Sequence, residues 1–331
     1  MKADVAYRNV DADMARLRTL GRSAGVSEGA LTILARSFHS RGVSAVSRQR
    51  ASCRGTYDYS QRLGAVRNQD SVGWCYAFAT ADILSDKTGR KISGAGVAVS
   101  YNDYWRWAYN LFQEDCGEGK AGWGGNETTA ISILRGSRGL CLESEFPSED
   151  NGNGKILDRL TALERARRSQ NRDRIVACAQ DVFPNIAQRD ILDVLRTSSQ
   201  QELVKNLSDR ACVHRVPMPS VTARNYRHLF NSADTLMSKI DAEITHGRLA
   251  SMGYTASMLY NIDTVTRDGG HSSVIVGRKW DARKNECVYL VRNSYGPGCR
   301  QYDRRLECTR GQIWVPRSVL SKGIVDVTTY H

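Results

Sequence analysis

The hydrophobic period of this chain changes after about residue 246. Before that point, apolar side chains recur at helical spacing, as in residues 75–91, 155–230 and 232–247. After it, β-branched and aromatic residues gather in four short runs divided by Gly, Asp and Asn: residues 248–260, 271–280, 287–296 and 311–320. Because the helical and strand patterns occupy separate parts of the chain, we expect an α+β fold with an antiparallel sheet.

Composition shifts divide the chain into four expected segments. Residues 1–52 form an arm with two short helical patterns and an Arg-rich end, and residues 53–150 form a helical lobe. The turn-rich stretch 147–155 leads into a basic helical insertion, 151–230, and the β-rich segment 231–331 follows.

Charge and hydropathy indicate whether nucleic acid, an acidic protein or a membrane is a partner of this chain. The net charge is +12, but most of the excess lies in residues 1–50 and 155–230. We therefore do not expect nucleic acid as the main partner, whereas an acidic partner for the basic insertion stays possible. No apolar run approaches the length of a membrane span, and the N-terminus lacks the apolar core of a signal peptide.

The nine cysteines indicate the compartment. None stands at C-x-x-C spacing, so we expect no metal site. Their number suggests up to four disulfides and one unpaired thiol, as in a secreted protein or in another oxidising compartment (extracellular, periplasmic or lysosome-like). The preferred pairs are Cys299 with Cys308, across a short polar loop, and Cys116 with Cys141.

Cys75 is the candidate nucleophile because it opens a helical pattern that ends at Gly89. The backbone N–H groups of a helix start stabilise a thiolate, so we expect a lowered pKa for Cys75. Among six histidines, His271 is the candidate base, since it follows two glycines and begins an apolar strand. Asn293 is the expected orienter of its ring, and the Gln69 amide and the Cys75 N–H are the expected donors to an oxyanion.

These residues resemble the papain family of cysteine peptidases. The stretch "NQDSVGWCYAFA" (68–79) is similar to the family's nucleophile motif, "GGHSSVIVG" (269–277) to its histidine strand and "RNSYG" (292–296) to its asparagine turn. The stretch "EDCGEGKAGWGGNE" (114–127) resembles the glycine-rich loop of its substrate cleft.

The resemblance implies a two-lobed fold with a helical lobe and an antiparallel, β-barrel-like lobe, and hydrolysis of peptide bonds through an acyl-enzyme. It implies no cofactor and no metal. It also implies that Gly124 and Gly125 line the substrate groove, that Gly270 flanks the histidine, and that Met252 lies near a pocket for a hydrophobic side chain.

Several positions depart from the family's pattern. Val72 stands at a cysteine position and Trp123 near that of its partner, so apolar packing is expected in place of one disulfide. Trp74 replaces a small residue, and Tyr295 replaces the tryptophan that shields the His–Asn hydrogen bond. The separation of Cys75 and His271 exceeds the family's spacing of about 130–150 residues, and the excess fits the segment 155–230.

The sequence thus predicts a secreted, monomeric thiol endopeptidase acting on protein or peptide substrates, with residues 1–52 as a pro-segment of a zymogen. One alternative is an inactive or weakly active fold of this type that serves as a binding module with a basic surface, and the bulky Trp74 beside the sulfur motivates it. Another keeps the sulfur chemistry but directs it to transamidation or amide trimming.

Overall fold

The computed structural model describes residues 53, 55–69, 73–101, 125–149, 156–198, 203–263 and 270–331. The chain divides into two compact units, Met1–Thr56 with Arg278–Val288 and Tyr57–Gly277 with Tyr289–His331. In the first unit a disulfide joins Cys53 to Cys287. The predicted arm, 1–52, lies outside the described residues. The division into four segments stays a prediction.

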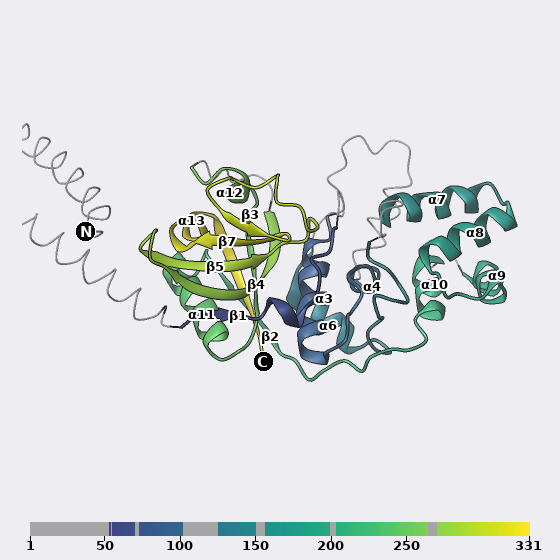
Figure 1. Cartoon of the computed structure of the whole chain (residues 1–331). Coiled ribbons are helices and arrows are strands. Elements are labelled where there is room, and N and C mark those ends of the chain that lie inside the picture. Colours follow the sequence, from purple (N-terminus) through teal and green to yellow (C-terminus); the bar gives the residue numbers. More distant parts are fainter. Residues whose placement is uncertain are drawn as a thin grey trace, which may run out of the picture. The chain divides into compact units, whose positions relative to one another are not determined.

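The β strands form one sheet (Figure 1) in the order β2-β8-β3-β4-β5-β7-β6, with β1 paired to β4. Their bounds are Tyr57–Asp58 (β1), Ala223–Arg227 (β2), Ala250–Thr255 (β3), Gly270–Asp281 (β4), Glu286–Arg292 (β5), Glu307–Thr309 (β6), Gln312–Pro316 (β7) and Ile324–Tyr330 (β8). The pairs β2–β8, β3–β4, β3–β8 and β6–β7 are antiparallel. Helices and an antiparallel sheet confirm the α+β class.

The four predicted strand runs correspond to β3, β4, β5 and β7, but the sequence pattern missed the short strands β1 and β6 as well as β2 and β8. Strand β2 is mostly polar, and neither its side chains nor those of β8 follow a strict apolar alternation. The end of the first run is the short helix α12, Ser257–Tyr260, and the end of the fourth is the helix α13, Arg317–Gly323. Helix α11, Ala233–Thr245, packs against β8 and β3.

The helical lobe is built around α3, Cys75–Thr88, which contacts α4, Gly94–Ser100, and α6, Glu127–Arg135. Ten consecutive residues of α3 are buried, from Tyr76 to Ser85, so this helix is central as predicted. It ends at Gly89, whose φ of 64° is left-handed and favours glycine. A short 3-10 helix, Ser60–Arg62, precedes the lobe.

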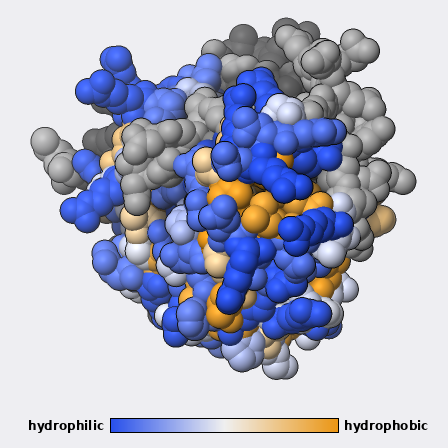
Figure 2. All heavy atoms as spheres, turned by 90° about the vertical axis from the view of Figure 1, so that its right-hand side faces the viewer, coloured by the Kyte–Doolittle hydropathy of each residue, from blue (hydrophilic) through white to orange (hydrophobic). Residues whose placement is uncertain are grey.

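The expected basic insertion contains four helices: α7 (Ile156–Arg168), α8 (Arg172–Val182), α9 (Gln188–Thr197) and α10 (Leu203–Ala211). Figure 2 shows the face of the molecule that carries these helices, where hydrophilic side chains surround a smaller hydrophobic area. Within the ranges that the structure describes, no helix has the length and apolarity needed to cross a membrane.

The disulfides confirm one predicted pair and overturn the other. Cys299 is bonded to Cys308, as expected from the short loop between them. Cys141 is bonded to Cys212 at the end of α10, so the predicted Cys116–Cys141 pair is wrong. The backbone pairing of Leu140 with Val216 brings these distant cysteines together. Cys178 is free as well as Cys75, so the expectation of a single free thiol is also wrong.

A buried ion network fixes the helical lobe to the sheet beside the site. The Asp82 carboxylate of α3 accepts hydrogen bonds from Arg67 Nη2 at 2.7 Å and Arg292 Nε at 2.8 Å. Arg67 also donates to Glu143 at 2.9 Å. Because Arg292 directly precedes Asn293 in the chain, this network positions the end of β5.

Candidate active site

Cys75 is the first residue of α3, where its half-buried thiol is free. The backbone N–H groups of Ser272, of Tyr76 and of Cys75 itself favour the thiolate form of its sulfur. Two of these N–H groups belong to the first turn of α3, as the sequence predicts, while Ser272 lies on β4. The sulfur therefore lies beside the residue that follows His271.

The predicted lowering of the thiol pKa is wrong. Burial and the neighbouring Glu127 carboxylate raise the pKa of Cys75 to about 11, and the three backbone N–H groups offset this only in part. Loss of water penalises the charged thiolate, and a second negative charge nearby penalises it further. The Cys75 thiol is consequently neutral near pH 7.

His271 lies at the start of β4, opposite Tyr254 of β3. Its Nε2 lies 2.7 Å from Asn293 Oδ1, directly after the end of β5. A carbonyl oxygen only accepts, so Nε2 carries the proton and Nδ1 keeps the lone pair that a general base needs. Burial lowers the pKa of His271 to about 4 despite the opposing effect of the Asn293 hydrogen bond, so the ring is neutral at rest.

Asn293 is itself held from several sides. It is 2% exposed, and its Nδ2 donates to Tyr302 Oη at 3.0 Å. Its Oδ1 also accepts from the Ser294 backbone N–H at 2.8 Å and from Ser273 Oγ at 3.3 Å. These contacts fix the amide with its oxygen toward the imidazole.

Two tyrosines enclose the imidazole. The Tyr295 ring stacks on His271 with centroids 4.7 Å apart, and Tyr254 meets it edge-on at 5.5 Å. Tyr295 thus covers the ring at the position where the sequence indicated a departure from tryptophan. Its hydroxyl lies 3.3 Å from His271 Nδ1, and no hydrogen bond joins that nitrogen to the Cys75 sulfur among the described side chains.

Gln69 lies against the chain that follows Asn293. Its backbone N–H donates to the Ser294 carbonyl at 2.7 Å, and its Oε1 accepts from Ser294 Oγ at 2.5 Å. Because the oxygen end of the carboxamide faces Ser294, the NH2 end is the one suited to donate to an oxyanion.

The four residues expected to bind substrate have different surroundings. Gly124 lies outside the described residues, as do Val72 and Trp123. Gly125 is exposed, and a Cβ on it would lie 2.6 Å from the Tyr76 ring, so packing alone explains this glycine. Gly270 is exposed at the start of β4, whereas Met252 is fully buried in β3 opposite Ser273. Their substrate contacts stay predictions.

Glu127 and Ser272 are residues at the site that sequence reasoning missed. Glu127 opens α6 after the N-cap Asn126, and its carboxylate accepts a hydrogen bond from Ser272 Oγ. A glutamate in the first turn of a helix is typical of an exposed position that favours the helix dipole. Only its burial, at 4% exposed, distinguishes it, and the sequence carries no signal for that.

One cluster of side chains has the spacing of metal ligands, but two of its members are joined in a disulfide. Cys141, Glu145 and Cys212 place their ligand atoms within 4.8 Å of one another. The two sulfurs are bonded to each other in a disulfide, so neither is available as a thiolate ligand.

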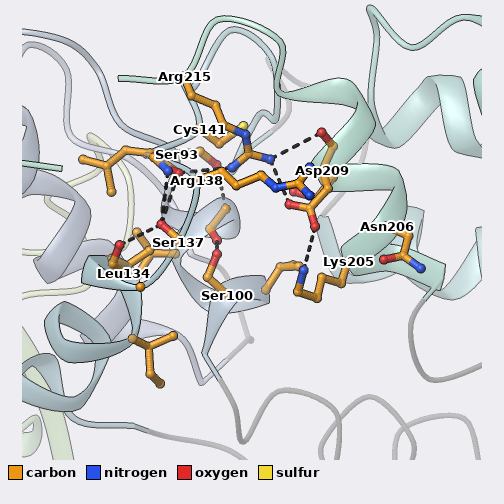
Figure 3. A pocket seen from close by; sticks show the side chains of 18 of the residues that line it. Ser93, Ser100, Leu134, Ser137, Arg138, Cys141, Lys205, Asn206, Asp209 and Arg215 are labelled. Atoms are coloured by element: carbon orange, nitrogen blue, oxygen red, sulfur yellow. Dashed lines mark hydrogen bonds and ion pairs between the residues drawn. The ribbon is translucent and has the colours of Figure 1, made fainter. Parts of the chain in front are cut away.

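A cavity of about 800 Å³ lies apart from Cys75, between the helical lobe and α9–α10 (Figure 3). None of Cys75, His271 and Asn293 lines it. On its wall the Asp209 carboxylate accepts from Lys205 Nζ at 2.6 Å and from Arg215 Nη2 at 2.9 Å. Lys205 and Arg215 of the basic insertion are therefore paired with Asp209 of the same chain. The expected binding of an acidic partner molecule to this insertion stays a prediction.

No protein-family model and no curated protein matches this chain. Solved structures do resemble it. The proform of the cysteine protease Amb a 11 from ragweed pollen matches with 14% identity and a TM-score of 0.47, over 83% of this chain and 64% of that one. The bromelain protease from Ananas comosus, bound to the inhibitor E64, matches with 14% identity and a TM-score of 0.45, over 83% of this chain and 97% of that one.

A third similar structure is digestive procathepsin L 3 from larval midgut of Tenebrio molitor. It has 13% identity and a TM-score of 0.45, over 84% of this chain and 70% of that one. The chain thus spans under two thirds of the ragweed proform but most of the bromelain chain. The solved structures that this chain resembles are papain-like cysteine proteases, at low sequence identity.

Proposed function

We propose that this protein is a cysteine peptidase in which Cys75 is the nucleophile, His271 the general base and acid, and Asn293 the residue that orients the imidazole. One observation carries the proposal. The His271 ring is fixed by Asn293 through Nε2, which leaves Nδ1 as the basic nitrogen, and the free thiol of Cys75 lies beside the next residue, Ser272.

The chemistry follows from these protonation states. The Cys75 sulfur attacks the carbonyl carbon of a peptide bond while its proton passes to His271 Nδ1. The Cys75 N–H and the Gln69 amide stabilise the oxyanion. His271 then protonates the departing amine, which leaves a thioester on Cys75, and a water activated by His271 releases the acid. Because both groups are neutral at rest, the proton transfer accompanies the attack.

The wider setting belongs to the same proposal. Three disulfides support a secreted protein or another oxidising compartment. We propose protein or peptide substrates, a monomeric state, and residues 1–52 as a pro-segment that restrains the zymogen. Deletion of residues 1–52 tests the last point, since an unchanged cleavage rate would remove it.

Substitution of the sulfur tests the activity. We expect Cys75→Ala to abolish cleavage of a mixed peptide library, read out by mass spectrometry. Cys178→Ala should retain cleavage, since Cys178 is the second free thiol among the described residues and lies on α8. Undiminished cleavage by Cys75→Ala would refute the proposal.

The main alternative is a binding module that has kept the fold. The raised pKa of the Cys75 thiol and the Tyr295 hydroxyl on His271 Nδ1 favour weak nucleophilic chemistry. A thiol-directed epoxide separates the two functions. A peptidase is labelled at Cys75 only while folded, whereas a binding module shows no labelling of Cys75 beyond that of Cys178.

A further inference from the structure

Glu127 is a buried carboxyl at the candidate active site. It is 4% exposed at the start of α6, and it accepts a hydrogen bond from Ser272 Oγ. Burial raises the pKa of Glu127 to about 7, and the bond from Ser272 opposes this shift only partly. The carboxyl therefore changes its charge within the neutral pH range.

Ser272 connects this carboxyl to the nucleophile. Its hydroxyl donates to Glu127, while its backbone N–H favours the thiolate of Cys75. Ser272 is 6% exposed and directly follows His271 on β4. Glu127 and Cys75 thus come from two different helices and both interact with one buried residue, Ser272.

The charges around Glu127 do not compensate it. From β8, Asp326 raises the pKa of Glu127 by like-charge repulsion, and the buried Tyr330 lies within electrostatic range. From α3 the neighbouring titratable group is Cys75 itself, and Arg227 of β2 acts on Asp326. Over the described ranges no lysine or arginine forms an ion pair with Glu127. Its negative charge therefore acts on the Cys75 thiol without a neighbouring cation in the described part of the chain to offset it.

We propose that Glu127 is a positioning residue that suppresses formation of the Cys75 thiolate while its carboxylate is ionised, and that protonation of this carboxyl releases the suppression. The coupling is reciprocal, since two like charges in a buried site disfavour each other equally. The inference rests on the proposed function only because it concerns the same thiol, Cys75. Its test is independent, since ionisation of the thiol can be measured without any peptide substrate.

The test is the rate of Cys75 alkylation by iodoacetamide as a function of pH, followed by mass spectrometry of the folded full-length protein. Cys178 of the same molecule serves as the internal reference. Glu127→Gln keeps the size and a hydrogen-bond acceptor but removes the charge. We expect its rate to match that of the wild type below about pH 6 and to exceed it about tenfold above about pH 8, the effect of one pKa unit on the thiolate population.

A matched control is Glu243→Gln, a buried glutamate of α11 that binds Arg248 and does not contribute to the pKa of Cys75. We expect its alkylation profile to follow the wild type. A ratio of Glu127→Gln to wild type that stays constant across pH would overturn the proposal, because loss of packing alone changes the rate equally at every pH.

A second variant covers the case in which Glu127→Gln does not fold. Ser272→Ala removes the hydroxyl that favours ionised Glu127, so suppression of the thiolate should begin at higher pH than in the wild type. An unshifted profile refutes the role of Glu127. Failure of the peptidase proposal can be distinguished from failure of the Glu127 proposal. In that case the alkylation profiles would show the predicted shifts, but no peptide would be cleaved.

Discussion

The Tyr295 ring lies parallel to the His271 imidazole, at 14° and 4.7 Å between centroids, with its hydroxyl 3.3 Å from Nδ1. In the proposed mechanism that nitrogen receives the thiol proton. The Tyr295 ring would then cover the imidazole while its hydroxyl competes with Cys75 for Nδ1.

Tyr295→Phe separates these two effects. The substitution keeps the stacked ring but removes the competing donor, so we expect the rate of peptide cleavage to rise by about threefold to tenfold, the range of one neutral hydrogen bond. Steady-state kinetics check it. Tyr295→Leu, which also loses the stacked ring, should not show the gain, and a slower Tyr295→Phe enzyme would mean that the hydroxyl assists the reaction.

Asn293→Ala removes the acceptor that fixes the imidazole tautomer. Because His271 then loses its oriented Nδ1, we expect kcat to fall by at least about 100-fold, the lower range for a positioned base. Ser273→Ala is the matched control, since it removes the weaker 3.3 Å contact to the same oxygen, together with the Ser273–Tyr254 hydroxyl hydrogen bond, and leaves the Asn293–His271 bond in place. Equal losses in the two variants would contradict a specific orienting role for Asn293.

The fall of peptidase activity at low pH should reflect protonation of His271. Burial lowers its pKa to about 4, and the base must be neutral to accept the thiol proton, so activity should persist well below the ordinary histidine value and fall as pH drops through about 4. A kcat/KM profile from about pH 3 to pH 6 measures this. A limb near the unperturbed value of about 6.5 would show that the imidazole is solvated.

Asp82 supports the site through its two arginines. Burial raises its pKa, but attraction by Arg292 and Arg67 outweighs this and leaves the pKa below the ordinary 3.8. A depressed carboxyl pKa stabilises the fold above the unfolded value and loses that contribution as pH falls through the folded one. Asp82→Asn should cost about 3–5 kcal/mol in urea unfolding at neutral pH and flatten the loss of stability below about pH 4. A change under about 1 kcal/mol would show that the network is dispensable.

Gly125 can be tested for its packing role. The Cβ of Gly125→Ala would lie 2.6 Å from the Tyr76 ring, so we expect a loss of about 1–3 kcal/mol of unfolding free energy. At Gly270 an added Cβ meets nothing within 4 Å, which makes Gly270→Ala the matched control with little change. Thermal denaturation of both variants measures the difference, and equal effects would contradict the packing argument.

Local features of the chain could be predicted from the sequence. The buried helix from Cys75 to its glycine cap, the strands β3, β4, β5 and β7, and the Cys299–Cys308 disulfide all follow from short-range patterns. Hydrophobic period, capping and loop length depend on neighbours in the sequence, so they can be read without coordinates.

Only the tertiary structure determined which distant residues are in contact and how those contacts shift the pKa of Cys75. The Cys141–Cys212 disulfide, the strands β2 and β8, and the contact of Glu127 with Ser272 join positions far apart in the chain. The helix start at Cys75 predicts an acidic thiol, but burial and the Glu127 carboxylate reverse the shift. Desolvation and charge repulsion depend on which groups are brought together in space, and the order of the residues alone does not specify that.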